Sequence, residues 1–451
     1  MFADAPDRWA RIEGPLSQNS AEARVARRAF VLQGRFRRFF SNLGPGLITG
    51  AADDDPSGIA TYSVTGAGFG YSLLWTALLS FPLMAAVQIM CARLGLVTGR
   101  GLAGVIRIHY PRWILWGACA LLLTANVVNI AADLGGMADV MQLLTGVKAL
   151  YWTPAYALLL AGLLFWTSYR LIARVFKWLT LVLFAYIAAA FLAHPDWHAV
   201  LRATLIPHVQ WSSAYWATLL GILGTTISPY LFFWQAAQEV EEDIASGKST
   251  VALREGASHR ELRRLRNDVL TGMFFSNLVM YFIILTSAAT LHAHGQTTIS
   301  TAREAAEALR PLAGAGAYWL FSLGLLGAGM LGVPVLAGSC AYAIAEAADW
   351  VGSLEVHPPL AHGFYGVIAV AMALGLGLNY AGLNAVKMLF WSAVLNGALA
   401  PPLLVLVVLL TSRADVMGEH RNGPLLRWLG WTCAGVMLMA TVIMLVTASA
   451  A

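Results

Sequence analysis

Long apolar stretches separated by short polar segments make up most of this chain. An α-helix needs about 20 mostly apolar residues, in a range of about 17–25, to cross the hydrocarbon core of a bilayer. By that measure the sequence predicts eleven membrane spans, at residues 41–66, 72–95, 113–144, 152–169, 175–193, 214–239, 269–291, 316–346, 364–380, 383–411 and 425–447. We therefore expect an all-α polytopic membrane protein, with a polar, basic arm over residues 1–40 and a single transmembrane domain over residues 41–451.

Two of these spans are interrupted by residues that break helices. In the first span the acidic run Asp53–Asp55 is followed directly by Pro56–Gly58, and in the sixth the polar run Gly224–Tyr230 contains a proline. Backbone groups freed by such breaks are tolerated at membrane depth only where they are buried in protein or line a cavity. Because five spans separate the two starts, the broken helices enter the membrane from opposite sides. Interrupted helices at matching positions of two halves are typical of inverted-repeat transporters with a binding site near the midplane.

Composition and charge agree with a membrane protein. Hydrophobic residues make up 58% of the chain and charged residues 12%, whereas about 25% of residues are charged in soluble domains. The excess of basic residues on one side places the N-terminus in the cytoplasm and the C-terminus outside. Of the 29 lysines and arginines, 24 fall on the arm's side, and the other five are Lys148, Arg202, Arg303, Arg310 and Lys387. The net charge of +5 therefore reflects topology, and we expect the lipid bilayer, not nucleic acid, as a partner.

The basic second half of the arm, residues 21–40, allows two interpretations. It has the composition of an amphipathic helix that lies on anionic lipid. It equally fits a plain topology signal, in which the basic residues only hold this end of the chain in the cytoplasm. The sequence favours the second interpretation without deciding between them.

Three consecutive aspartates inside an apolar span are the most unusual feature of the chain. A charged side chain at the bilayer centre costs about 2.5–3.5 kcal/mol on insertion scales and usually serves function. Carboxylates beside freed carbonyl groups suit a hard cation. Asp55 directly precedes the break and is the first candidate ligand. Asp54 points about 100° away from it and suits an ion held through water. Asp53 is expected to face an outer vestibule or a hydrogen-bond donor. The alternative is that the acids cap the second half-helix, for which one acid would suffice.

The break in the sixth span offers further oxygen atoms. The Thr225 carbonyl and Ser228 are the main candidates, with Thr226 beside them, although hydroxyls in membrane helices also serve plain helix packing. Tyr230 follows the proline and is placed to gate the path or donate to a carboxylate. Gln235 lies further along the same helix and is a candidate for the inner path.

The third span carries a polar stripe. Asn126, Asn129 and Asp133 are spaced by three and four residues and therefore share one helix face. Asp133 either conducts cations or protons, or pairs with an arginine. Asn396 in the tenth span is a second buried amide, which serves either helix packing or the ion path.

An acidic cluster and four cysteines complete the candidate chemistry. The cluster ends the sixth span, where it either concentrates cations at the inner mouth or is a solvated helix end; it consists of Glu239, Glu241, Glu242 and Asp243. The cysteines are scattered singly in apolar spans, so we interpret them as buried small hydrophobes and not as metal ligands. No cofactor and no obligate protein partner is indicated.

At these motifs the chain resembles the Nramp (natural resistance-associated macrophage protein) family of divalent-metal transporters. Gly44–Gly46 followed by Asp55–Gly58 is similar to that family's GPG and DPGN motifs, and Ser228–Tyr230 falls where the family has MPH. The resemblance implies a LeuT-like fold of inverted five-helix repeats, with broken helices 1 and 6 around a metal site. It also implies that the ligands include the Asp55 side chain and the carbonyl groups of Ala52 and Thr225.

Four positions differ from the family pattern. Gly58 stands for the motif asparagine, Ser228 for the metal-binding methionine and Tyr230 for a histidine, while Asp133 matches one acid of the proton path and Gly136 replaces the other. Without the thioether, the site has only hard oxygen ligands, and these suit Mg²⁺, which keeps several waters. The pattern is similar to the NRAMP-related magnesium transporter branch. It implies a bacterial inner-membrane transporter of Mg²⁺ and also Mn²⁺, working by alternating access without proton coupling.

Three other functions compete with this interpretation. A proton-coupled Mn²⁺/Fe²⁺ importer would share the fold and the site. A sodium-coupled carrier of organic solutes would share only the fold, and three aspartates would repel anionic substrates. An intramembrane aspartyl hydrolase would use Asp55 and Asp133 as a dyad with one raised pKa, but no further catalytic motif accompanies them. We therefore expect a transporter and not an enzyme.

Overall fold

The computed structural model describes residues 45–167, 171 and 181–449, and every regular element within these ranges is a helix. The long helices are α4 (Thr76–Thr98), α6 (Arg112–Thr145), α7 (Ala149–Trp166), α14 (His259–Thr290), α17 (Ala317–Ala348), α18 (His362–Asn379), α19 (Ala385–Ser412) and α21 (Pro424–Ser449). Two pairs of shorter helices meet at breaks, and these are α2 (Pro45–Asp53) with α3 (Pro56–Phe69), and α11 (Ser213–Thr226) with α12 (Pro229–Ala245).

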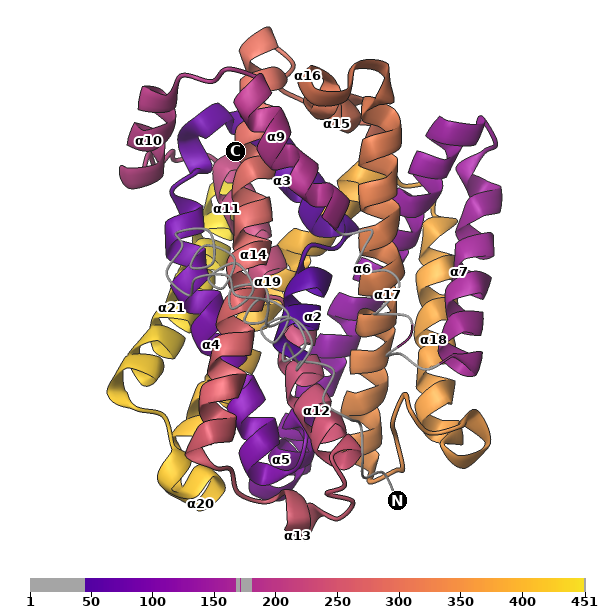
Figure 1. Cartoon of the computed structure of the whole chain (residues 1–451), viewed down its shortest axis with the longest axis vertical. Helices are drawn as coiled ribbons and strands as arrows, with labels where there is room; N and C mark the ends of the chain where they lie inside the picture. Colours follow the sequence, from indigo (N-terminus) through magenta and orange to yellow (C-terminus); the bar gives the residue numbers. More distant parts are fainter. Residues whose placement is uncertain (1–44, 168–170, 172–180, 450–451) are drawn as a thin grey trace, which may run out of the picture. The chain divides into compact units, whose positions relative to one another are not determined.

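Short helices gather at the two ends of the described bundle (Figure 1). One end carries α10 (Trp197–Leu205), α15 (Ala302–Ala306) and α16 (Arg310–Ala313), close to α9 (Ala185–Leu192). The opposite end carries α5 (Leu102–His109), α13 (Val251–Arg254) and α20 (Ala414–Met417). These short segments connect the long helices and define two faces of the bundle.

The described helices follow the predicted spans closely. Nine helical segments in the described ranges are long and apolar enough to cross a membrane, with α11 and α12 counted as one segment and α15 to α17 as another. The first predicted span forms the pair α2 and α3, and only the segment 181–192 of the fifth span is described. The number eleven therefore stays a prediction, and the basic arm lies outside the described residues.

The helix that carries the seventh span begins ten residues before the span. The apolar span is predicted from residue 269, and α14 begins at His259. The reason is a capping box in which the Ser258 hydroxyl accepts a hydrogen bond from the Glu261 N–H and the Glu261 carboxylate accepts one from the Ser258 N–H. This motif satisfies the first free N–H groups of a helix, so the helix starts in polar sequence well before its apolar part.

Both breaks form where the sequence places a proline. Asp55 is the N-cap of α3, and its side chain accepts a hydrogen bond from the Gly58 N–H, with Pro56 at the first helical position. Ser228 is the N-cap of α12 in an extended conformation, again with a proline directly after it. Proline lacks an N–H and clashes with the preceding turn, so it starts a helix well and continues one badly.

Glycines bring the broken helices very close to their neighbours. A Cβ atom on Gly46 of α2 would lie 2.7 Å from the backbone nitrogen of Val269 in α14. Gly50, four residues further along α2, meets the backbone of Gly272 in the same way. Paired small residues at this spacing allow close approach of helices in membranes. On the other side, a Cβ atom on Gly332 of α17 would lie 3.0 Å from the Cβ atom of Asp55, so α17 also packs directly on the first break.

Candidate functional site

Asp55 both caps α3 and faces the third span. Its side chain is 2% exposed. One carboxylate oxygen, Oδ1, accepts hydrogen bonds from the Ser57 hydroxyl at 2.6 Å and from the Gly58 N–H at 2.9 Å. The other, Oδ2, accepts one from the amide of Asn129 in α6 at 2.8 Å. The capping interpretation is therefore correct for Asp55, but an ionised carboxylate has about four lone-pair sites and can bind a cation as well.

Asp53 and Asp54 do not cap the helix. The Ser276 hydroxyl of α14 lies 2.5 Å from Oδ2 of Asp53 and 3.4 Å from Oδ1 of Asp54. A hydroxyl donates only one proton, so it serves one of these carboxylates at a time. Oδ1 of Asp53 has no hydrogen-bond partner among the described residues. Two adjacent buried carboxylates thus share one donor, and a cation would satisfy the oxygen atoms that this donor leaves free.

Hydroxyl groups at the second break bond to carbonyl groups in the last turns of α11. Thr225 and Thr226 both donate to the Ile222 carbonyl at 2.9 Å. Ser228 lies within hydrogen-bond distance of the Gly224 carbonyl, at 2.7 Å, and of the Thr225 carbonyl, at 2.8 Å. The helix-packing alternative therefore describes the two threonine hydroxyls. The lone pairs of Ser228 and the second lone pair of the Thr225 carbonyl remain available to a ligand.

Tyr230 joins the two broken helices. Its hydroxyl donates to the Ala52 carbonyl at 3.0 Å, across the space between α12 and α2. Tyr230 was expected to gate the path or donate to a carboxylate; here its hydroxyl donates instead to a carbonyl group that Pro56 leaves without a helical partner. The Ala52 carbonyl keeps one lone pair, so its predicted role as a ligand is compatible with this bond.

The polar stripe of α6 divides into two parts. Asn126 donates to the Leu336 carbonyl at 3.0 Å and to the Ser339 hydroxyl at 2.7 Å, and so binds α6 to α17. Asn129 holds Asp55, and its own amide oxygen has no partner among the described residues. Asp133 is fully buried, and within the described ranges neither of its oxygen atoms has a hydrogen bond of normal geometry or a basic partner. The arginine-pair interpretation thus finds no support in the described structure.

Residues of the inner path also lie in the protein interior. The Gln235 amide donates to Glu239 at 2.8 Å, one turn along α12, and its oxygen lacks a partner among the described residues. Glu241 accepts a hydrogen bond from Tyr342 of α17 at 3.0 Å. Asp243 accepts one from Lys248 at 2.9 Å. Only Glu242 of this acidic cluster is exposed, so the solvated-end interpretation is wrong for three of its four members.

Every predicted site and pathway residue is closed off from solvent. Their side chains are at most 4% exposed, and this holds for Ala52, Asp53, Asp54, Asp55, Asn129, Asp133, Thr225, Ser228, Tyr230, Gln235 and Asn396. Asn396 of α19 is buried with both amide atoms unpartnered within the described ranges. Across the described residues, no group of three or more histidines, cysteines, aspartates and glutamates is arranged to hold a metal ion. The four cysteines are free and buried, as the sequence predicted.

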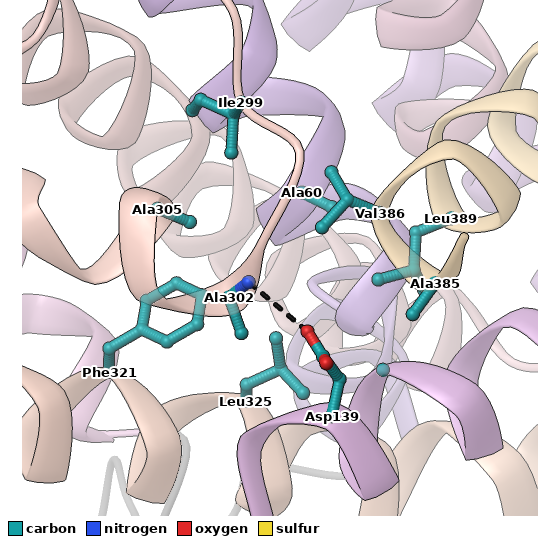
Figure 2. Close-up of a pocket in the computed structure, with 11 residues that line it drawn as sticks. Ala60, Asp139, Ile299, Ala302, Ala305, Phe321, Leu325, Ala385, Val386 and Leu389 are labelled. Atoms are coloured by element: carbon teal, nitrogen blue, oxygen red, sulfur yellow. Dashed lines mark hydrogen bonds between the residues drawn. The ribbon is translucent and has the colours of Figure 1, made fainter. Parts of the chain in front are cut away.

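A small cavity lies among α3, α6, α15, α17 and α19 (Figure 2). It has a volume of about 10 Å³, which is about the room that one water molecule needs. Its walls include Ala60, one turn beyond the start of α3, and Gly136 and Asp139 of α6. Asp139 accepts a hydrogen bond from the Ala302 N–H at 3.1 Å and so ties α6 to α15 (Figure 2).

Three residues beside the site escaped the sequence analysis. Ser276 contacts the site from α14, and sequence spacing alone cannot show such a contact. Asp139 lies on α6 and lines the small cavity. Tyr62 is different, because it lies four residues after Gly58 and therefore on the same face of α3. Helical spacing from the break was a signal that could have identified it.

The chain is similar in sequence and in fold to known transporters. The chain is 29% identical over 413 residues to the divalent metal cation transporter MntH of Deinococcus radiodurans, covering 89% of this chain and 88% of that protein. A solved structure of the Eremococcus coleocola manganese transporter, in complex with an aromatic bis-isothiourea substituted compound, superimposes with a TM-score of 0.69 at 21% identity, covering 92% of this chain and 87% of that one. MhsT in complex with L-phenylalanine superimposes with a TM-score of 0.60 at 11% identity, covering 89% of this chain and 98% of that one.

These comparisons establish the fold and the family. The fold is LeuT-like, with broken helices in the first and sixth spans, and the chain is an integral membrane protein. The relatives are metal transporters, which excludes the hydrolase alternative. The sequence model of the natural resistance-associated macrophage protein-like family matches residues 46–447. The chain therefore belongs to the Nramp family.

Proposed function

We propose that this chain transports divalent metal cations, with Mg²⁺ preferred and Mn²⁺ also accepted, by alternating access around the two helix breaks. The observation that carries the proposal is a group of buried oxygen atoms without hydrogen-bond partners among the described residues. Around the first break they are Oδ1 of Asp53, Oδ1 of Asn129 and both carboxylate oxygens of Asp133. Buried polar atoms are nearly always satisfied, and a cation with its waters would satisfy these.

The chemistry of the donors favours Mg²⁺. Carboxylate, amide, hydroxyl and carbonyl oxygens are hard ligands, and Ser228 supplies an oxygen where a thioether would favour softer transition metals. Mg²⁺ sheds its waters reluctantly and is usually bound through one or two carboxylates with several waters retained. In this proposal Asp55 binds the ion directly, Asp54 binds through water, and the Ala52 and Thr225 carbonyls with Ser228 complete the oxygen shell.

The ion path extends from this site toward both faces. On the side of α15, Asn129 and Asp133 line the way to the cavity beside Asp139, and Asp53 and Asn396 supply further polar groups. On the side of α13, Tyr230 and Gln235 line the way along α12. All of these groups are buried here, so alternating access requires helices to part on one side at a time.

Proton coupling has little chemical support in these residues. A tyrosine hydroxyl ordinarily loses its proton near pH 10, so Tyr230 is a poor proton carrier at neutral pH. Gly136 has no side chain, and a Cβ atom there would lie 2.8 Å from Cδ1 of Leu389. Influx would then be driven by the ion gradient and the membrane potential, which supplies about 2.3 kcal/mol per charge per 100 mV and twice that for a divalent ion. Of the positions where the family pattern has proton-handling groups on the third and sixth spans, the competing proton-coupled Mn²⁺/Fe²⁺ importer would keep only Asp133.

The distribution of basic residues supports a membrane location and an orientation for this chain. We propose a bacterial inner-membrane protein with a cytoplasmic N-terminus and an external C-terminus, which places α5, α13 and α20 on the cytoplasmic face. Arg100, Arg107, Lys248 and Arg254 in and around these helices supply the positive charge expected there. The chain would act without an obligate protein partner, which reconstitution of the purified protein alone would test.

The test is metal influx into proteoliposomes that contain only this chain, with Mg²⁺ and Mn²⁺ indicators used in parallel. Mg²⁺ influx that Asp55→Ala abolishes is the expected result. The matched control is Asp196→Asn, which changes another N-cap aspartate, on α10, away from both breaks. Influx of Mn²⁺ without any influx of Mg²⁺ would contradict the magnesium preference.

A further inference from the structure

Tyr62 is a buried tyrosine with an unexplained hydroxyl group. It lies on α3, one helical turn after Gly58, and its side chain is fully buried. Its hydroxyl has no hydrogen bond of normal geometry with any described residue. Buried tyrosine hydroxyls usually find a partner. The position of this one therefore needs a reason beyond the packing of the ring.

The ring of Tyr62 covers the place where Gly58 has no side chain. A Cβ atom on Gly58 would lie 3.4–3.5 Å from the ring carbons Cε2 and Cζ and 3.5 Å from the hydroxyl oxygen. The same hydroxyl is near the Thr225 side chain of the second break and within the electrostatic field of the three aspartates of the first. It thus lies where the two breaks face each other, beside the oxygen atoms proposed to bind the ion.

The hydrogen-bonding capacity of the neighbours fixes what this hydroxyl can do. The Thr225 hydroxyl gives its proton to the Ile222 carbonyl, so toward Tyr62 it can only accept. Tyr62 can therefore donate to Thr225 or to a carboxylate while its own lone pairs stay free. A water molecule bound to a metal ion uses a lone pair on the metal and points both hydrogens outward. Such a water is the donor that the free lone pairs of Tyr62 can accept.

We infer that Tyr62 is a specificity-determining residue, whose hydroxyl accepts a hydrogen bond from a water carried by the transported divalent ion in the space that Gly58 leaves open. The inference rests on the proposed function, because it requires the two breaks to form the ion site. Tyr62 would hold the ion through water, without a direct bond to the metal.

Water-mediated binding has a consequence for selectivity. Mg²⁺ keeps several waters when bound to proteins. A hydroxyl that accepts a hydrogen bond from such a water should therefore contribute more to the binding affinity for Mg²⁺ than to that for ions that shed water readily. Removing the hydroxyl while keeping the ring should weaken the binding of Mg²⁺ more than the binding of Mn²⁺. The maximal rate should change little, since the helices that move keep their packing.

The experiment compares Tyr62→Phe with Tyr186→Phe. Tyr186, on α9, is also buried, and its hydroxyl likewise lacks a hydrogen bond of normal geometry in the described structure, so it serves as a matched control. The full-length protein is assayed for Mg²⁺ and Mn²⁺ influx in proteoliposomes. Mn²⁺ affinity is measured separately on the purified protein by electron paramagnetic resonance.

For Tyr62→Phe we expect the KM for Mg²⁺ to rise about fivefold or more, the KM for Mn²⁺ to rise less, and the maximal rate to stay within about twofold. Tyr186→Phe should leave all three unchanged. An unchanged KM for Mg²⁺, or an equal rise for both ions, would overturn the inference.

If Tyr62→Phe does not fold, Gly58→Ala tests the same idea, because its methyl group would contact the Tyr62 hydroxyl at ordinary distance. It should then raise the KM for Mg²⁺ selectively, and no change would overturn the inference.

The wild-type protein tests the proposed function separately from the role of Tyr62. A wild-type chain that moves Mn²⁺ but no Mg²⁺ would contradict the magnesium preference, and Tyr62 would then be judged by Mn²⁺ affinity alone. Equal Mn²⁺ affinities of wild type and Tyr62→Phe would overturn its role. A wild-type chain that binds neither ion would overturn both proposals.

Discussion

The two helix breaks look alike in sequence but satisfy their polar groups in opposite ways. At the first break, between α2 and α3, the polar groups depend on other helices: Ser276 of α14, Asn129 of α6 and Tyr230 of α12 donate to them. At the second break, between α11 and α12, Thr225 donates within α11, and Ser228, the N-cap of α12, donates back to the last turn of α11, so no other helix takes part. The first break therefore changes its hydrogen bonds whenever neighbouring helices move, whereas the second keeps them.

This difference assigns the two breaks different tasks. All three carboxylates lie at the first break, so it supplies the negative charge that a divalent ion requires. The second break supplies neutral oxygen atoms on a helix end that is already satisfied and can move as one piece. If this division is correct, changes at the first break should have much larger effects than changes at the second.

The largest effect is expected from Asp55→Asn. Asparagine is about as good an N-cap as aspartate, so α3 should keep its start while the charge is lost. A hydrogen bond to a charged group contributes about 1.5–3 kcal/mol, and the upper value corresponds to about 100-fold in binding. We expect Mg²⁺ influx to fall by about that factor, with thermal unfolding little changed. Influx within threefold of wild type would show that the charge of Asp55 is dispensable.

Ser276→Ala should have the next largest effect. It removes the only described donor shared by Asp53 and Asp54, and an unsatisfied buried group costs about 1–3 kcal/mol. The melting temperature of the protein should fall and the KM for Mg²⁺ should rise. Ser63→Ala is the control, since Ser63 is equally buried but only donates to the Ile59 carbonyl of its own helix. Equal melting temperatures for the two variants would contradict the dependence of the first break on α14.

A moderate effect is expected from Tyr230→Phe, which cuts the bond between α12 and the Ala52 carbonyl. A neutral hydrogen bond contributes about 1 kcal/mol, or about fivefold, and the Mg²⁺ transport rate should change by about that factor. Because Tyr230 holds a helix end and carries no proton in this account, the pH dependence of influx should not change. A shifted pH profile would instead identify Tyr230 as a proton carrier.

The smallest effect is expected from Ser228→Ala. The second break loses one oxygen ligand and one hydrogen bond between the N-cap of α12 and the end of α11, so the KM for Mg²⁺ should rise by no more than about fivefold. Influx assays on Ser228→Ala and Asp55→Asn in parallel give the ratio of the two effects. If Ser228→Ala reduced Mg²⁺ influx as much as Asp55→Asn, the two breaks would contribute equally to transport, which would contradict the division of tasks proposed above.

The helices and breaks could be predicted from the sequence because local chemistry determines them. Apolar runs of sufficient length gave the spans, and Pro56 and Pro229 gave the breaks. The partners of the polar groups could not be predicted, because Ser276 lies more than 200 residues from the aspartates it serves. Tyr230 was expected to gate the path or donate to a carboxylate, and its hydroxyl donates to the Ala52 carbonyl; spacing along a helix does not show which neighbour lies opposite. The early start of α14 was readable in principle from Ser258 and Glu261.

The most direct test of the account measures Mg²⁺ influx and internal pH together in proteoliposomes at a set membrane potential. Carboxylate ligands must lose their protons to bind a metal, so without proton coupling, influx should stay level or fall as the external pH is lowered. The account predicts Mg²⁺ influx that rises with a negative interior and causes no acidification. Acidification that accompanies metal influx, together with faster influx at low external pH, would contradict it and support proton-coupled transport.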